Sequence, residues 1–271
     1  RIPAGARPAY RALEGALAAH EADFAAVLAR IEAVADDLTR IAAAPPPRPR
    51  WDQGWFPRLD AAAAYAIVRH LRPRRIVEIG SGHSTRFFAR AVADEGLATR
   101  IVAIDPAPRA TLAGLNGVEW RRAPAQSVAE HECAHLQAGD ILAIDSSHIL
   151  VPGSDVDVLF GRVLPHLPPG TYVHIHDIFL PDDYPAAWEW RGYNEQLGVV
   201  AMLLGGRWAP VFASHYVITR MAATVADSTV ARLPLMPGAI ESSLWLRARS
   251  SVPPSAAARS RPPGHDEITA F

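Results

Sequence analysis

The sequence predicts an α/β fold in which a mostly parallel sheet carries helices on both faces. From about residue 60 onward, short apolar runs alternate with stretches of helical periodicity, and this alternation is typical of doubly wound sheets. Several apolar runs end at a glycine or an aspartate, which is where ligands of such sheets bind. The length of 271 residues suits one such domain with an appendage.

The first expected element is a long, alanine-rich helix over residues 9–44. Its apolar residues recur at alternating spacings of four and three, the heptad pattern that buries a stripe against another helix. The stripe comprises Leu13, Leu17, His20, Phe24, Val27, Ile31, Val34, Leu38 and Ile41. Two interpretations stay open: the helix lies on its own domain, or it pairs subunits of a homo-oligomer. The run of prolines from Pro45 ends it, so we expect an N-terminal helical arm over residues 1–45.

The main domain is expected over residues 46–249, with strands and helices in alternation. Strands are predicted at 75–79, 100–104, 118–122, 140–144, 171–175, 208–218 and 239–247. Helices are predicted at 60–70, 85–95, 128–136, 155–164 (capped by Ser154) and 189–204. An irregular stretch rather than a helix is expected between the last two strands, so the last strand should run antiparallel. Residues 250–271, rich in Ser, Pro, Ala and Arg, are expected to form a disordered tail.

Composition excludes several classes of function. The net charge of −1 gives no electrostatic basis for nucleic-acid binding, and no apolar run approaches the 18 residues of a membrane span. Cys133 is the only cysteine, so no internal disulfide forms and a cytoplasmic location is expected. All 27 Lys and Arg residues are arginines, which excludes any mechanism that needs a deprotonated lysine.

The apolar run at 75–79 leads into a glycine-rich turn, VEIGSGHST over residues 77–85. Gly80 and Gly82 allow a tight turn and a close approach to a ligand. A dinucleotide fingerprint would have a third glycine where Thr85 stands, and a pyrophosphate would disfavour the nearby Glu78. Asp105 ends the next strand, where a carboxylate can bind ribose hydroxyls, although a turn aspartate is the alternative interpretation.

The E-x-G-x-G turn, the acid that ends the second strand and the acid that ends the fourth resemble those of class I S-adenosylmethionine-dependent methyltransferases. The resemblance runs from about residue 51 to residue 247. Within this superfamily, the segments IVEIGSGHST, AIDSSH, HIHDIFLPDDYP and SSLWL are similar to those of a group of small bacterial methyltransferase domains. The resemblance implies a Rossmann-like seven-stranded sheet, S-adenosylmethionine as cofactor, and methyl transfer to an O or N of a small-molecule acceptor.

The resemblance also assigns roles to particular residues. It implies that Glu78, Gly80, Ser81 and Gly82 line the methionine end of the cofactor, that Asp105 binds the ribose, that Gln126 lies near the adenine, and that Asp145 faces the amino group or the reacting centre.

Two polar segments should converge at the carboxyl edge of the sheet. They supply Asp145 and His148 after one strand, and His174, His176 and Asp177 at the end of another. Imidazole and carboxylate ligands suit Fe, Mn, Zn or Ni. In the related metal-dependent macrolide sugar O-methyltransferases, an acid and an Asp-Asp pair hold Mg. Here Asp145 matches that acid, and His176 and Asp177 stand at the position of the pair, so His176 replaces its first aspartate. A metal-free polar site is the alternative, and both stay open.

Methyl transfer to oxygen requires removal of the acceptor's proton or a metal that lowers its pKa. His148 is the first candidate for the general base, because the unperturbed pKa of histidine is close to neutral. His176 and Asp177 are the next candidates. We expect replacement of His148 or Asp177 to abolish turnover and leave cofactor binding nearly intact.

Aromatic and polar residues over 179–195 suit a lid above a small organic acceptor, with packing beneath a loop as the alternative. His215 is interpreted as a core histidine. His131, Glu132 and His135 satisfy the H-E-x-x-H pattern, but their helix is expected far from the cofactor edge, which argues against a metalloprotease. Three rival functions remain: a metal-centred enzyme of another class on the same fold, a catalytically silent cofactor-binding or interaction protein, and a nicotinamide dehydrogenase.

Overall fold

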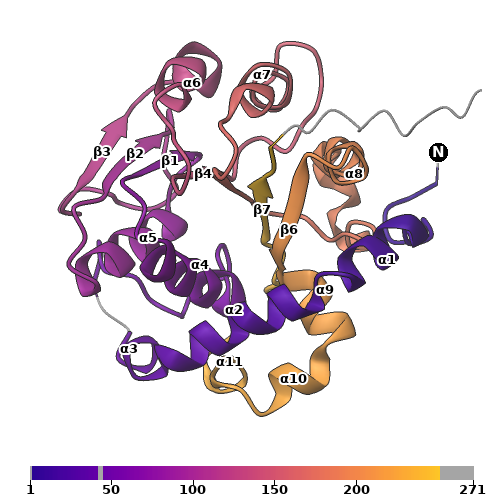
Figure 1. The fold of residues 1–271 in the computed structure, drawn as a ribbon, viewed down its shortest axis with the longest axis horizontal. Coiled ribbons are helices and arrows are strands. Elements are labelled where there is room, and N and C mark those ends of the chain that lie inside the picture. Colours follow the sequence, from indigo (N-terminus) through magenta and orange to yellow (C-terminus); the bar gives the residue numbers. More distant parts are fainter. Residues whose placement is uncertain (1, 42–44, 251–271) are drawn as a thin grey trace, which may run out of the picture.

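The computed structural model describes residues 2–41 and 45–250 and contains a seven-stranded mixed sheet (Figure 1). The strands are β1 (Arg75–Ile79), β2 (Arg100–Ile104), β3 (Val118–Arg121), β4 (Ile141–Ile144), β5 (Tyr172–Ile175), β6 (Trp208–Ala213) and β7 (Leu244–Ala248). Their order is β3-β2-β1-β4-β5-β7-β6, and β7 runs antiparallel to both of its neighbours. The predicted fold class, with its antiparallel last strand, is confirmed.

Helices cover both faces of the sheet, as Figure 1 shows. On one face lie α4 (Arg58–Leu71) and α5 (His83–Asp94), and α2 (Glu21–Ala33) packs against α4 and β6. On the other lie α6 (Ala125–Cys133), α7 (Asp155–Val158) and α8 (Glu195–Leu204). The central strands are therefore buried on both sides, which explains why β1, β2 and β4 are nearly continuous apolar runs.

The register of the central strands aligns the carboxyl ends of β1, β2 and β4, from which three loops start. Ile79 of β1 lies opposite Ile104 of β2 and Ile144 of β4. Two hydrogen bonds continue the ladder past the strand ends, from Gly80 N–H to the Ile104 carbonyl (2.9 Å) and from Asp145 N–H to the Ile79 carbonyl (2.8 Å). The segments after β1, β2 and β4 therefore leave the sheet side by side.

The expected long N-terminal helix is divided into three helices: α1 (Arg11–Ala18), α2 and α3 (Ala35–Thr39). The apolar stripe is buried in the chain's own core, where Phe24 packs edge-on against Phe212 (6.1 Å between centroids) and Tyr216 (5.7 Å). Of the two interpretations of the heptad pattern, the described structure therefore shows the arm lying on its own domain. The domain boundaries at residues 45 and 249 remain predictions, and the expected tail lies outside the described residues beyond Ser250.

The region after β6 differs from the expectation. The predicted strand at 208–218 ends at Ala213, and α9 (Ser214–Arg220), α10 (Ala222–Ala226) and α11 (Thr229–Arg232) occupy the stretch expected to be irregular. A short apolar run fits a strand or a buried helix equally well, so its periodicity could not separate the two. The last strand accordingly begins at Leu244, later than predicted.

Two predicted helices are broken in the structure. The expected helix at 189–204 consists of the 3-10 helix η3 (Ala186–Arg191) and α8, separated at Gly192, whose φ is +65°. The expected helix at 155–164 begins as α7 and continues as the π-helical turn η1 (Leu159–Val163) and the 3-10 turn η2 (Leu164–His166). The predicted cap is confirmed, because Ser154 Oγ accepts a hydrogen bond from Asp157 N–H at 3.0 Å. No helix within the described ranges is both long and apolar enough to cross a membrane.

Candidate active site

The turn after β1 requires glycine at its first position. Gly80 has a φ of +76°, and a β-carbon placed on it would lie 1.7 Å from the carbonyl oxygen of Asp145. Gly82 has extended backbone, and a β-carbon there would meet nothing closer than 3.8 Å. Packing against the β4 loop therefore demands Gly80, whereas the protein itself would accommodate a methyl group at Gly82.

Glu78 holds this turn through hydrogen bonds to side chains of the helix that follows it. Its buried carboxylate accepts hydrogen bonds from the hydroxyls of Ser84 and Thr85, at the start of α5. Thr85 Oγ1 in turn accepts the N–H of Gly82 at 3.0 Å. Burial raises the pKa of Glu78 to about 8. Glu78 is not among the residues that line the adjoining cavity, so the contacts present here support a role in holding the turn, and its predicted contact with the cofactor remains a prediction.

A cavity of about 270 Å³, cavity A, opens above the glycine turn. Four of the predicted cofactor residues besides Asp145 line it: Gly80, Ser81, Gly82 and Asp105. Asp105 accepts the N–H groups of Ser81 and Ala107, both at 2.7 Å, so this aspartate stabilises its turn and also faces the cavity. Gln126 is exposed and does not line the cavity, whereas its neighbour Ala125 does.

A second cavity, cavity B, has a volume of about 280 Å³. Its walls include His176 and Asp177 from the end of β5 and Trp188 and Arg191 from η3. Three residues line both cavities, namely Trp55, Arg109 and Asp145. The Arg109 guanidinium lies 4.3 Å from the centre of the Trp55 ring, so this stacked pair and the Asp145 carboxylate form the common border.

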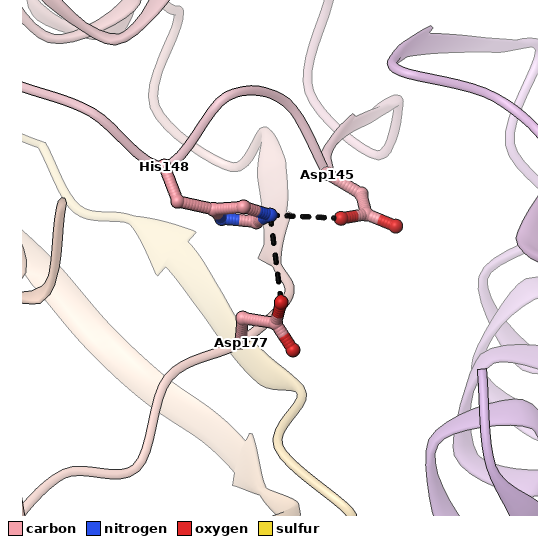
Figure 2. Close-up of side chains that lie close together, drawn as sticks. All are labelled: Asp145, His148 and Asp177. Atoms are coloured by element: carbon pink, nitrogen blue, oxygen red, sulfur yellow. Dashed lines mark ion pairs between the residues drawn. The ribbon is translucent and has the colours of Figure 1, made fainter. Parts of the chain in front are cut away.

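At this border, the loops after β4 and β5 bring together Asp145, His148 and Asp177 (Figure 2). His148 Nε2 lies 3.2 Å from Asp145 Oδ1 and 3.5 Å from Asp177 Oδ2. His176 Nδ1 approaches the same two carboxylates, at 3.4 Å from Asp177 Oδ1 and 3.8 Å from Asp145 Oδ1. Asp145, His148 and Asp177 therefore converge on one point, and His176 lies within 4 Å of both carboxylates.

The outer nitrogen of each imidazole contacts a further buried carboxylate. His148 Nδ1 lies 2.9 Å from Glu195 Oε2, and His176 Nε2 lies 3.2 Å from Asp60 Oδ2. Asp60 also accepts the N–H groups of Ser242 and Ser243, which fixes its position. A carboxylate on the far nitrogen orients an imidazole and makes it a better metal ligand.

Sequence reasoning did not assign these two carboxylates to the site. The sequence pattern places Glu195 in the predicted lid and Asp60 in a predicted helix. The signal for Asp60 was present, because it is the only charged residue between Arg58 and Arg69 in an alanine-rich helix. A fully buried acid is almost always paired.

The backbone at the cluster is strained. His148 (φ +59°) and Asp177 (φ +57°) are two of the three non-glycine residues with positive φ in the described chain. The His148 carbonyl accepts the N–H groups of Asn194 (3.1 Å) and Glu195 (3.2 Å), and Ser242 Oγ donates to Asp177 Oδ1 (3.2 Å). Such strain concentrates at functional sites, where the surroundings hold it in place.

The carboxylates govern the charge of the two histidines. Burial opposes protonation of His176, but Asp177, Asp145 and Asp60 outweigh it and raise its pKa to about 9. Burial likewise opposes protonation of His148, whereas Asp145, Glu195 and Asp177 raise its pKa well above the ordinary value. Burial disfavours ionisation of Asp145, yet His176 and His148 lower its pKa overall. In this arrangement the neighbouring carboxylates favour the protonated form of both histidines in the metal-free protein, and the role of His148 as a general base remains a prediction.

The remaining candidate histidines lie elsewhere. His174 is buried behind the cluster, with Nε2 2.8 Å from Ser243 Oγ, and burial lowers its pKa to about 3. It is not part of the group whose ligand atoms converge. His215 lies on α9 and contacts Asp182 at 2.9 Å, away from both cavities. His131 on α6 and His135 in the turn after it pack against each other and likewise line neither cavity.

The donor set fits a divalent cation. One ligand atom from each of Asp145, His148 and Asp177 lies within 4.8 Å of the others. Carboxylate oxygens with an imidazole nitrogen are the ligands of Mn, Fe and Zn sites, and Mg binds through the oxygens. The carboxylates behind both histidines supply the outer shell that such sites require.

The comparison with known protein families matches the part of the chain that contains these residues. The model of a family described as a methyltransferase domain matches residues 77–178, from β1 to just beyond β5. Residues 77–178 of the chain are similar to a methyltransferase domain. The resemblance to class I methyltransferases expected from the E-x-G-x-G turn is thereby confirmed, and the matched span of the domain contains the glycine turn, Asp105 and the Asp145, His148 and Asp177 cluster.

Solved structures of the same general fold have low identity to this methyltransferase-domain chain. The SAH-bound methyltransferase PaMTH1 of Podospora anserina is 16% identical over 70% of this chain and 78% of its own, with a TM-score of 0.45. An O-methyltransferase of Bacillus cereus in complex with SAH is 20% identical over 68% and 82%, with a TM-score of 0.35. The branched-chain polyamine synthase of Thermus thermophilus is 16% identical over 79% and 63%, with a TM-score of 0.46. No curated protein matches the sequence significantly.

Proposed function

We propose that this methyltransferase domain transfers the methyl group of S-adenosylmethionine to an oxygen of a small-molecule acceptor, with nitrogen as the second choice of atom. The observation that carries the proposal is the shared border of the two cavities. Cavity A adjoins the glycine turn, cavity B adjoins the histidines, and Asp145 lines both. A donor in one and an acceptor in the other would meet at Asp145, and positioning of this kind supplies much of the acceleration of a displacement.

In the proposed complex, the cofactor occupies cavity A. Asp105 already accepts two backbone N–H groups, and the lone pairs of its carboxylate that remain free accept hydrogen bonds from the ribose hydroxyls. The turn at Gly80, Ser81 and Gly82 contacts the methionine portion through main-chain atoms. Similar solved structures are described as complexes with SAH or SAM, which agrees with this choice of cofactor.

For the acceptor side, we propose that Asp145, His148 and Asp177 hold a divalent metal, with His176 beside them. When bound, such a metal lowers the pKa of an acceptor hydroxyl and replaces the protons on the histidines. The chain's own part is to orient the acceptor in cavity B and to receive its proton. Asp177 is the proposed proton acceptor because it lines cavity B, whereas His148 lines neither cavity; His176, which also lines cavity B, is the second candidate.

The proposed reaction is balanced without a further reactant. The acceptor O–H proton passes to the Asp177 carboxylate, the oxygen forms a bond to the methyl carbon, and the carbon–sulfur bond of the sulfonium breaks to leave the thioether. His174 is left out of the proposed metal ligands because its Nε2 contacts Ser243. The expected cytoplasmic location and pairing of subunits remain predictions.

The test combines cofactor binding with turnover. Calorimetry should detect one molecule of SAH per chain, and labelled S-adenosylmethionine should methylate members of a library of hydroxylated aromatic and sugar acceptors in the presence of Mg, Mn, Fe or Zn. EDTA should abolish turnover and leave SAH binding intact. SAH binding with no methylation across the library would favour a silent cofactor-binding protein. A bound metal without any SAH binding would favour a metal-centred enzyme of another class.

A further inference from the structure

The wall of cavity B also carries a guanidinium that forms no ion pair within residues 2–41 and 45–250. Arg191 ends η3, and its guanidinium lies 4.0 Å from the centre of the Trp188 ring and 5.4 Å from that of Tyr193. Its Nη1 donates to Tyr193 Oη at 3.2 Å. These contacts hold the side chain in position without neutralising its charge.

The remaining hydrogen-bond donors of Arg191 lack partners. Its Nε is enclosed by protein and has no acceptor within the described residues. No ion pair is formed between Arg191 and a carboxylate in the part of the chain that the structure describes. This is unusual in a chain where most partly buried arginines contact acids, such as Arg58 with Glu241 and Arg69 with Asp37.

A second arginine on the same cavity has the same property. Arg109 stacks on Trp55 at the border with cavity A and has no ion pair within residues 2–41 and 45–250. Asp145 and Asp177 of cavity B contact His148 and His176 and form no ion pair with either guanidinium. Cavity B is thus lined by two carboxylates, the His176 imidazole and two guanidiniums that have no ion pair among the described residues.

We propose that the methyl acceptor is a hydroxy carboxylic acid, whose carboxylate binds Arg191 while its hydroxyl lies at Asp145 and Asp177. This inference rests on the proposed methyl transfer and adds the class of its substrate. A guanidinium held by stacking on an aromatic ring is a preferred partner of a planar carboxylate. The small volume of cavity B, about 280 Å³, suits an acceptor of the size of a substituted benzoic acid. Arg109 stands at the border, where it also reaches cavity A.

The experiment compares acids with their neutral amides. The probes are 3,4-dihydroxybenzoate, 3-hydroxybenzoate and 4-hydroxyphenylacetate, each paired with its amide, and binding is measured by calorimetry on the SAH-saturated protein and on the protein alone. Methylation is measured in parallel with labelled S-adenosylmethionine. The variants are R191M, R191K and the control R122M, because Arg122 also stacks on a tryptophan but lies outside both cavities.

The acids should be preferred over the amides by the wild-type protein, in binding and in kcat/KM. R191M should lower kcat/KM for the acids about 10- to 100-fold through KM, the size expected for loss of a charge-assisted hydrogen bond, and should leave the amides and SAH binding unchanged. R191K should restore part of the loss, and R122M should behave as wild type.

The inference is overturned if the wild-type protein methylates acids and amides with equal kcat/KM, or if it binds none of the acids. It is also overturned if R191M leaves kcat/KM for the acids unchanged. Failure of the proposed function is a separate outcome: a protein that binds the acids through Arg191 but binds no SAH retains the anion site and loses the methyl transfer. An R191M protein that no longer binds SAH would assign Arg191 to the cofactor and also overturn the inference.

Discussion

The α-carbon of Gly80 lies against the main chain of Asp145, so closely that a β-carbon on Gly80 would stand 1.7 Å from the Asp145 carbonyl oxygen. This contact joins the turn after β1 to the loop after β4. It sets the border between the two cavities, because Asp145 contributes to both of them.

Replacement of Gly80 by alanine should therefore damage the fold as well as the site. The clash and the positive φ together should cost about 3 kcal/mol or more of unfolding free energy. The matched variant G82A should have nearly wild-type stability, since its methyl group meets nothing closer than 3.8 Å. Chemical denaturation of both variants tests this, and equal destabilisation would contradict the geometry described for the turn.

Stability should decrease between about pH 5 and pH 8 through Glu78. Burial raises its pKa from an ordinary 4.5 to about 8, so the folded protein holds a proton that the unfolded chain releases. The stabilisation is complete below the unfolded pKa and is lost as the pH rises through the folded one. E78Q, which mimics the protonated acid, should reduce this slope in melting temperatures measured from pH 5 to 9. The exposed variant E130Q is the control and should keep the wild-type slope.

Metal binding should tighten as the pH rises toward 9. His176 has a pKa of about 9 in the metal-free protein, and His148 is also raised, so a divalent metal must displace protons from both. Titration with Mn at several pH values should show the apparent affinity increasing with pH. Proton release measured in two buffers of different ionisation enthalpy provides a second readout, and a pH-independent affinity would argue against histidine ligands.

The buried acids behind the histidines should matter to metal affinity without touching the metal. E195Q and D60N should weaken Mn binding about 10- to 100-fold, the usual cost of removing an outer-shell carboxylate. SAH binding should persist in E195Q, because Glu195 lines neither cavity. D227N, on the surface, serves as the control. Unchanged metal affinity in both variants would show that these contacts only stabilise the fold.

Truncation of the apolar stripe of the arm should destabilise the single chain. Phe24 is fully buried and packs on Phe212 and Tyr216, so F24A should cost about 3–5 kcal/mol. The molar mass from light scattering should be the same for F24A and wild type. A dimer that dissociates on this substitution would instead support the pairing of subunits through the arm.

The sequence by itself determined the order of strands and helices in the central sheet and the location of the glycine turn. It could do so because five-residue apolar runs that end in glycine or aspartate and alternate with helical periodicity are typical of the parallel strands of a doubly wound sheet. The convergence of Asp145, His148, His176 and Asp177 was likewise predictable, since the carboxyl ends of adjacent parallel strands meet at one edge. The same reasoning could not separate His174 from His176, two residues apart on one face of β5, and it missed the helical character of residues 214–220.

Only the tertiary structure decided which buried carboxylates contact the outer nitrogens of His148 and His176. Asp60 comes from a helix 116 residues before His176, and Glu195 lies 47 residues after His148, so no local pattern relates either pair. Glu78 contacts the hydroxyls of Ser84 and Thr85, which no local pattern predicted, because the direction of a side chain in a tight turn depends on the hydrogen bonds around it; its expected contact with the cofactor remains a prediction. Asp145 and Asp177, together with these distant carboxylates, raise the pKa of the two histidines, and charge in a buried site is a property of the whole surrounding fold.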